Sequence, residues 1–197
     1  MSGYMVLERL MEASHGYLMA SQAVENGVSR TVLSQYVKDK GLERVARGIY
    51  IADDVWTDEL FVLQVRNENI VYCGETALYL HGLIDREYSK ICISVPRGVN
   101  VAHIKISNLH VKYPSRELHL LGVCQVTSIS GNDVRAYDKE RCICDLIKNR
   151  SKTEVQDFQI AIKEYMSGRD KNLSRLVEYA KILGIRDEVM KYLEVLL

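Results

Sequence analysis

The most constraining part of the sequence is residues 18–51, in which two short helical patterns are followed by two short β-like runs. Residues 18–25 have the apolar spacing of a helix and are closed by Asn26-Gly27, two residues that tolerate a left-handed backbone. Ser29 is a suitable N-cap for a further helix over residues 30–40. Two short helices joined by a tight glycine-containing turn are typical of a helix-turn-helix.

A helix is also expected before this stretch, because Met5, Val6, Leu7, Leu10 and Met11 recur at helical spacing. We expect it to end near Ser14-His15-Gly16, since glycine commonly stops a helix at its C-terminus.

The helix predicted over residues 30–40 has two different faces. Four apolar side chains cluster on one side at 100° per residue and should pack on the preceding helices; they are Val32, Leu33, Tyr36 and Val37. The opposite side carries short polar residues with a cation at the end, which suits a helix that enters the major groove of DNA. An ordinary solvated helix face is the alternative interpretation.

Two β-like runs, residues 42–46 and 49–51, lie on either side of Arg47-Gly48. Glycine allows the sharp turn of a hairpin at this point. A basic hairpin directly after such a helix is a wing, whose Arg44 and Arg47 would lie along the phosphates or probe the minor groove. Residues 1–52 are therefore predicted to form a winged helix-turn-helix that binds double-stranded DNA, although some winged helices bind proteins instead.

The local charge supports this surface. The whole chain is neutral, with 26 basic and 26 acidic residues, but residues 29–48 hold five basic and two acidic side chains, a local charge of +3. We expect nine side chains to contact DNA: Ser29, Arg30, Thr31, Ser34, Gln35, Lys38, Lys40, Arg44 and Arg47.

The remainder, residues 53–197, is predicted to be a mixed α+β domain. Helices are expected at 56–66 and 74–83, the second ending at Gly82. A strand-rich region over 90–137 follows, and a helical region over 139–197 ends the chain. The strands are expected at 90–95, 101–106, 110–112, 123–129 and 134–137, and the last helices at 139–149, 153–166, 173–183 and 186–196.

Cysteine usage and hydropathy indicate the compartment. Five scattered cysteines without C-x-x-C spacing are a poor disulfide framework and fit a reducing environment, where they serve as small buried hydrophobes. No signal peptide and no apolar run of about 18 residues is present. We expect a cytoplasmic protein with no membrane association.

An enzyme is not expected. The sequence has no P-loop, no Gly-x-Ser-x-Gly and no His-Glu-x-x-His. His81 lies on an apolar helix and is interpreted as a packing residue, while His103, His110 and His119 have spacings that match no metal template. We therefore predict no catalytic residue, no metal and no cofactor.

In several of these features the chain resembles the AbiEi antitoxins of the AbiE (type IV) abortive-infection toxin–antitoxin systems. Four features in order carry the resemblance, over about residues 3–150: the helix-turn-helix from Gly16 to Lys40, the wing Arg47-Gly48-Ile49-Tyr50-Ile51, the Thr76-to-Leu83 segment with His81-Gly82-Leu83, and Tyr137 to Ile147. The helices after about residue 153 are harder to match.

The resemblance implies an antitoxin and autorepressor. Such a protein binds inverted repeats in its own promoter and neutralises a cognate nucleotidyltransferase-like toxin, either by direct contact or through the toxin's target. Two molecules are expected on the repeat, as a dimer or as monomers that assemble on the DNA. The alternatives are a winged-helix regulator with a ligand-sensing or oligomerisation domain and no toxin, and a pure protein-interaction module.

Overall fold

The computed structural model describes residues 2–196 and divides the chain into two compact units. The N-terminal unit runs to Arg66 and includes Thr127–Val134, and the C-terminal unit comprises Asn67–Val126 and the chain from Arg135 onwards. The chain therefore passes between the units three times. The functional division between residues 52 and 53 remains a prediction.

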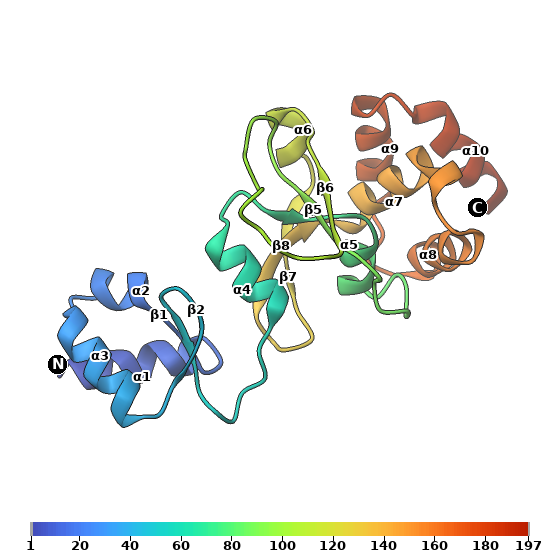
Figure 1. Ribbon diagram of the computed structural model, residues 1–197. Coiled ribbons are helices and arrows are strands. Elements are labelled where there is room, and N and C mark those ends of the chain that lie inside the picture. Colours follow the sequence, from blue (N-terminus) through green and yellow to red (C-terminus); the bar gives the residue numbers. More distant parts are fainter. Residues whose placement is uncertain (1, 197) are drawn as a thin grey trace. The chain divides into compact units, whose positions relative to one another are not determined.

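The N-terminal unit contains a helix, a strand, a helix pair, a hairpin and a last helix (Figure 1). Their bounds are α1 Gly3–Ala13, β1 Tyr17–Met19, α2 Ala20–Glu25, α3 Arg30–Asp39, β2 Glu43–Ala46, β3 Ile49–Ile51 and α4 Glu59–Arg66. Among the described residues the three strands form a sheet of order β1-β3-β2 in which both pairings are antiparallel. The predicted winged helix-turn-helix is confirmed.

One element differs from the expected helix over residues 18–25. Leu18 and Met19 belong to β1, where Leu18 pairs with Tyr50 and Met19 with Ile49, and α2 begins only at Ala20. Periodicity alone does not separate a short buried strand from one helical turn. The pairing with β3 decides the outcome, since it gives the backbone of β1 its hydrogen-bond partners.

The core of the helical part collects the apolar faces of α1, α2 and α3. Leu7, Leu18 and Ala23 are fully buried, and Leu33 and Tyr36 from α3 pack with them. Burying a leucine or a large aromatic side chain contributes about 1.5–3 kcal/mol. The expected apolar face of α3 is therefore what fixes this helix on the unit.

A second cluster covers the other side of the small sheet, where Tyr17, Ile49 and Ile51 pack with Phe61 of α4. Helix α4 begins at Glu59, three residues later than expected, because Asp58 precedes the helix and its Oδ1 accepts a hydrogen bond from Phe61 N at 3.0 Å. The buried Asp58 also accepts from Asn132 Nδ2 at 3.0 Å, so residues 127–134 are tied to this unit.

The C-terminal unit is built on a sheet of order β6-β5-β4-β8-β7 among the described residues, followed by helices (Figure 1). The elements are β4 Val71–Tyr72, α5 Gly74–Leu80, β5 Ile91–Ser94, β6 Leu109–Lys112, α6 Arg116–Leu120, β7 Val123–Thr127, β8 Asp133–Tyr137, α7 Lys139–Lys148, η1 Arg150–Lys152, α8 Val155–Ser167, α9 Leu173–Ile182 and α10 Arg186–Leu196. The predicted α+β class is confirmed.

The expected strand over residues 101–106 is wrong, and β4 and α6 are additional elements. The segment instead forms local turns, in which Ala102 N donates to Asn100 Oδ1 at 2.8 Å and Ile104 N donates to the carbonyl of Val101 at 2.9 Å. Its β-branched residues favoured a strand, but its backbone groups are used locally and Val101 is buried without pairing.

Helix α7 is the central helix of the C-terminal unit. All its side chains from Glu140 to Ile147 are buried, although three of them are charged. Asp138 is its N-cap and accepts from Arg141 N at 2.8 Å. No helix within residues 2–196 is long and apolar enough to cross a membrane.

Candidate nucleic-acid interface

Helix α3 presents its polar face to solvent. Its first backbone groups are capped by Ser29, whose Oγ accepts a hydrogen bond from Val32 N at 3.3 Å. Leu33 and Tyr36 point into the core. The polar residues of the helix, among them Thr31 and Ser34, are exposed on the opposite side. The positive end of the helix dipole adds to the field at the exposed N-terminus.

The wing begins after α3 with β2 and turns at Arg47-Gly48. Gly48 adopts φ +74°, a left-handed conformation that glycine takes without strain. The register shifts between Arg44 and Ala46, so the hairpin carries an irregularity directly beside its turn. The turn exposes Arg47 at the tip of the wing.

All nine side chains predicted to contact DNA are exposed on α3, its caps or the wing. They are Ser29, Arg30, Thr31, Ser34, Gln35, Lys38, Lys40, Arg44 and Arg47. Whether these nine contact DNA remains a prediction, because exposure is a requirement for contact and not a measure of it.

Two of these cations have partners within the protein. Lys40 Nζ lies 3.1 Å from Glu8 Oε1 in α1, and the hydrogen bond to Glu8 raises the pKa of Lys40. Arg44 Nε donates to the carbonyl of Ala46 at 3.3 Å, which holds its guanidinium along the wing. Arg30 and Arg47 form no ion pair with any described residue. The cations of this set therefore differ in how readily they can approach a phosphate.

Gln35 is also held by its neighbours. Its Nε2 donates to Asp39 Oδ1 at 2.7 Å, and the other oxygen of Asp39 accepts from the hydroxyl of Tyr4 at 2.6 Å. Sequence reasoning identified Gln35 but missed Tyr4 and Asp39, because Tyr4 is 35 residues away from Asp39 in the chain.

A groove of about 480 Å³ runs beside the N-terminal half of α3. Its lining comes from α2, α3 and β3: Ala20, Ser21, Val24, Glu25, Arg30, Leu33, Ser34 and Tyr50. Ser21 and Tyr50 were not predicted from the sequence, and they line the same groove as two of the predicted residues, Arg30 and Ser34. The only signal in the sequence that could have pointed to this groove was the hydroxyl group of Ser21 at the start of α2.

This geometry agrees with a comparison to known families. Residues 6–86 match the family described as a transcriptional regulator, AbiEi antitoxin N-terminal domain. This part of the chain is therefore similar to the N-terminal domain of AbiEi antitoxins. No curated protein matches the chain.

The AbiEi domain match confirms the resemblance seen in the helix-turn-helix, the wing and residues 76–83, and it extends through α4, β4 and α5. The fourth feature of the resemblance, residues 137–147, lies outside the matched range. The match identifies a DNA-binding regulator domain of antitoxins and covers less than half of the 197 residues.

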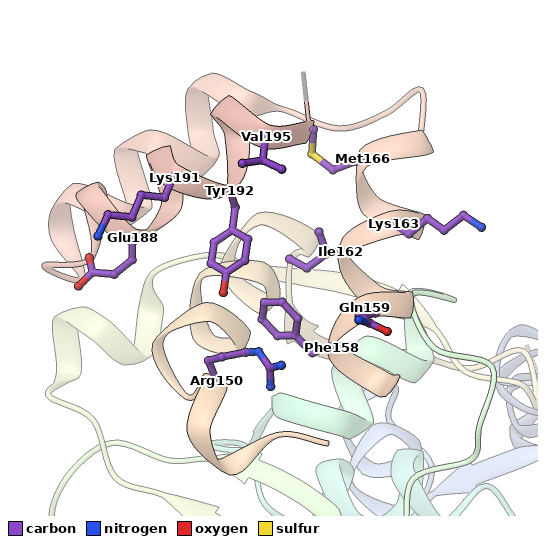
Figure 2. A pocket seen from close by; sticks show the side chains of 10 residues that line it. All are labelled: Arg150, Phe158, Gln159, Ile162, Lys163, Met166, Glu188, Lys191, Tyr192 and Val195. Carbon is purple, nitrogen blue, oxygen red and sulfur yellow. The ribbon is translucent and has the colours of Figure 1, made fainter. Parts of the chain in front are cut away.

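Outside the AbiEi match, an open groove of about 700 Å³ lies between α8 and α10. Figure 2 shows Phe158, Ile162 and Tyr192 gathered at its centre, while the charged ends of Lys163 and Lys191 point outward. Arg150 lies over the ring of Phe158, with 4.3 Å between the guanidinium carbon and the ring centroid. The groove offers an apolar floor with a charged rim, and the sequence analysis did not predict it.

A smaller cleft of about 300 Å³ lies where α5, β5, β6 and α7 meet. Lys112 Nζ lies 3.6 Å from Asp145 Oδ2, and Asp157 on the same cleft pairs with Arg86 at 3.0 Å. Asp145 and Asp157 are therefore neutralised by cations of the same protein.

Two histidines of the C-terminal unit, the buried His119 and the partly buried His81, bind other protein groups. His119 Nδ1 lies 3.1 Å from Ser94 Oγ, which is 2.7 Å from the hydroxyl of Tyr137, and all three side chains are buried. His81 Nε2 lies 2.8 Å from the carbonyl of Tyr137. Burial lowers the pKa of both histidines. A serine beside a histidine suggests a nucleophile, but buried groups that satisfy one another have a packing role.

The described residues contain no group of three His, Cys, Asp or Glu side chains able to hold a metal ion. Cys73, Cys92, Cys142 and Cys144 are buried and unpaired, and Cys124 is partly buried. Burial raises the pKa of Cys73 and of Cys144 to about 12. These thiols are therefore poor nucleophiles.

Proposed function

We propose that this protein binds inverted repeats in the promoter of its own operon through α3 and the wing, and so represses its own transcription. One observation carries the proposal: the nine residues chosen from the sequence are all exposed on these elements, within a domain of the AbiEi regulator family. A helix with short polar residues enters the major groove, and a basic wing follows the phosphates.

Binding to paired sites follows from the charge. One winged helix with a local charge of +3 in a neutral chain contacts few phosphates and so binds a single half-site weakly. Two molecules on an inverted repeat, as a dimer or as monomers that assemble on the DNA, restore the affinity.

Gel shifts with the DNA upstream of the gene test this activity. Arg30→Ala and Gln35→Ala are expected to weaken discrimination between sequences. Lys38→Ala, Arg44→Ala and Arg47→Ala should weaken binding to every sequence and reduce the salt dependence, each by a slope of about 0.9. Unchanged affinity in all five variants would show that the proposed surface is wrong.

We also propose that the protein neutralises a cognate nucleotidyltransferase-like toxin. The support is the antitoxin description of the matched family. Co-expression with a nucleotidyltransferase reading frame next to the gene should restore growth that the reading frame alone arrests. Persistent arrest at equal toxin levels would contradict the antitoxin role.

A regulator without a toxin is the alternative, and the groove between α8 and α10 favours it. A volume of about 700 Å³ lies within the usual range of small-molecule sites, and an open apolar groove also suits self-association. The two functions are distinguished by whether a nucleotidyltransferase reading frame lies next to the gene and by the co-expression assay. The alternative requires that the protein binds the promoter but does not restore growth.

A further inference from the structure

Tyr4 of α1 and two exposed side chains of α3, Asp39 and Gln35, form one hydrogen-bonded chain that leads from α1 to the predicted DNA-binding face. Tyr4 donates to Asp39 Oδ2 at 2.6 Å, and Gln35 Nε2 donates to Asp39 Oδ1 at 2.7 Å. The ring of Tyr4 packs edge-on against Tyr36, with 5.1 Å between the ring centroids. The chain is therefore anchored to the core of the domain through Tyr36, which is buried.

The direction of the hydrogen bond from Gln35 is determined by the charge of its partner. An ionised carboxylate only accepts hydrogen bonds, so the amide of Gln35 must turn its NH₂ group toward Asp39. The hydrogen bonds from Tyr4 and, second, from Gln35 lower the pKa of Asp39, and the same bond raises the pKa of Tyr4. Asp39 is thus ionised at neutral pH, and the opposite orientation of the amide would place two acceptors together.

This orientation leaves Gln35 with two groups for DNA. Its Oε1 accepts one hydrogen bond, and the second hydrogen of Nε2 donates another. Adenine offers the matching pair in the major groove, the N6 amino donor beside the N7 acceptor. Guanine presents two acceptors there, O6 and N7, which would face the outward Oε1 with no hydrogen to share.

We propose that Asp39, held by Tyr4, is a positioning residue that orients the amide of Gln35 to read an adenine in each half-site. This inference rests on the proposed DNA binding and adds to it the base that Gln35 selects and the two residues that make the selection. Asp39 itself contacts no base. Its effect passes through the orientation of Gln35.

A purely structural role for the same contacts has a different signature. Gln and Asp four residues apart also stabilise an isolated helix, and Tyr4 links α1 to α3. Loss of such support would weaken binding to all sequences alike. Loss of orientation lowers the preference for one base at one position, and leaves the other positions unchanged.

The experiment selects binding sites for the full chain from a library of random DNA duplexes, and then measures affinities for the selected site and its single-base variants. The position read by Gln35 is the one whose preference disappears in Gln35→Ala. Replacing its adenine with 7-deazaadenine removes the N7 acceptor. Asp39→Asn and Tyr4→Phe test the two positioning residues, since each keeps the size and shape of the side chain.

Glu8→Gln is the matched control, because it breaks the other polar link between α1 and α3, the contact with Lys40, and leaves Asp39 unchanged. We expect an adenine at the position read by Gln35. Asp39→Asn should lower its preference over the other bases by about three- to tenfold, Tyr4→Phe less, and Glu8→Gln not at all. The 7-deaza base should weaken the wild type and leave Gln35→Ala unaffected.

Three results would overturn the inference while DNA binding stands: a guanine at that position, an undiminished preference in Asp39→Asn, or an equal loss at all positions. A wild-type chain that enriches no sequence and binds no duplex would instead overturn the proposed function itself. The two failures are therefore distinguishable.

Discussion

Lys40 at the end of α3 is paired with Glu8 of α1, with 3.1 Å between Nζ and Oε1. The same ammonium lies 5.8 Å from the ring centroid of Tyr36. Lys40 was predicted from the sequence to contact DNA. In the protein without DNA, the ammonium of Lys40 forms an ion pair with the carboxylate of Glu8. Lys40 can therefore interact fully with a phosphate only when this ion pair is broken.

The first prediction follows from this pair. Glu8→Gln removes the competing carboxylate, so affinity for any DNA duplex should rise by about twofold or more at low salt, and the salt dependence should steepen. Titrations at several salt concentrations measure both. An affinity equal to or below that of the wild type would show that Lys40 does not contact a phosphate.

The second prediction concerns the cap of α3. Ser29→Ala removes the acceptor for Val32 N and should destabilise the N-terminal unit by about 1 kcal/mol in urea unfolding. Ser29→Asp keeps a capping oxygen and should retain stability, but its charge repels phosphates, so its DNA affinity should fall severalfold. A variant pair that loses stability and affinity in parallel would contradict a separate DNA contact at Ser29.

The third prediction is a pH dependence of stability. Burial lowers the pKa of His81 and of His119 below the ordinary value of 6.5. Between the folded and the unfolded pKa the unfolded chain binds more protons, so stability is complete above pH 6.5 and falls as the pH decreases below it. The slope is at most about 1.4 kcal/mol per pH unit for each histidine.

Urea unfolding between pH 7.5 and pH 5.5 measures this slope. Burial raises the pKa of the carboxyl of Asp138, and the effect of this group on stability has the opposite sign. His81→Gln and His119→Asn should each reduce the slope, and the exposed His110→Gln should not. A slope that persists in the double variant would assign the dependence to other groups.

The fourth prediction concerns Arg141 in the C-terminal unit. Its Nε lies 3.1 Å from Asp145 Oδ1, its Nη1 donates to the carbonyls of Leu118 and Leu121 at 2.7 and 2.9 Å, and only 4% of the residue is exposed. Arg141→Leu should cost about 3 kcal/mol or more, because it leaves the two carbonyls without this donor and leaves Asp145 with Lys112 as its remaining cation. Leucine at the exposed Arg169 is the control, and a similar loss there would refute the specific role.

How far the sequence alone predicts the fold depends on whether the signal is local. The two faces of α3, the cap at Ser29 and the turn at Gly48 were all predicted, because helical periodicity and turn chemistry are written in a few consecutive residues. The expected strand at 101–106 failed for the opposite reason: β-branched residues show a preference, and a strand also needs a partner.

The candidate site divides in the same way. The exposed residues of α3 and the wing could be named from the sequence, and they lie within the range of the family match, residues 6–86. The sequence did not show which of them have partners. Tyr4 reaches Asp39 across 35 residues and Lys40 reaches Glu8 across 32, and neither pairing has a local pattern.

The sequence by itself thus determined the elements and the outward-facing side chains of the winged helix, because amphipathic spacing, caps and glycine turns act over a few residues. The tertiary structure alone decided that Tyr17–Met19 is a strand, that Tyr4 binds Asp39, and that α8 and α10 enclose an apolar groove. These features depend on contacts between segments that are far apart in the chain, and only the complete fold brings such segments together.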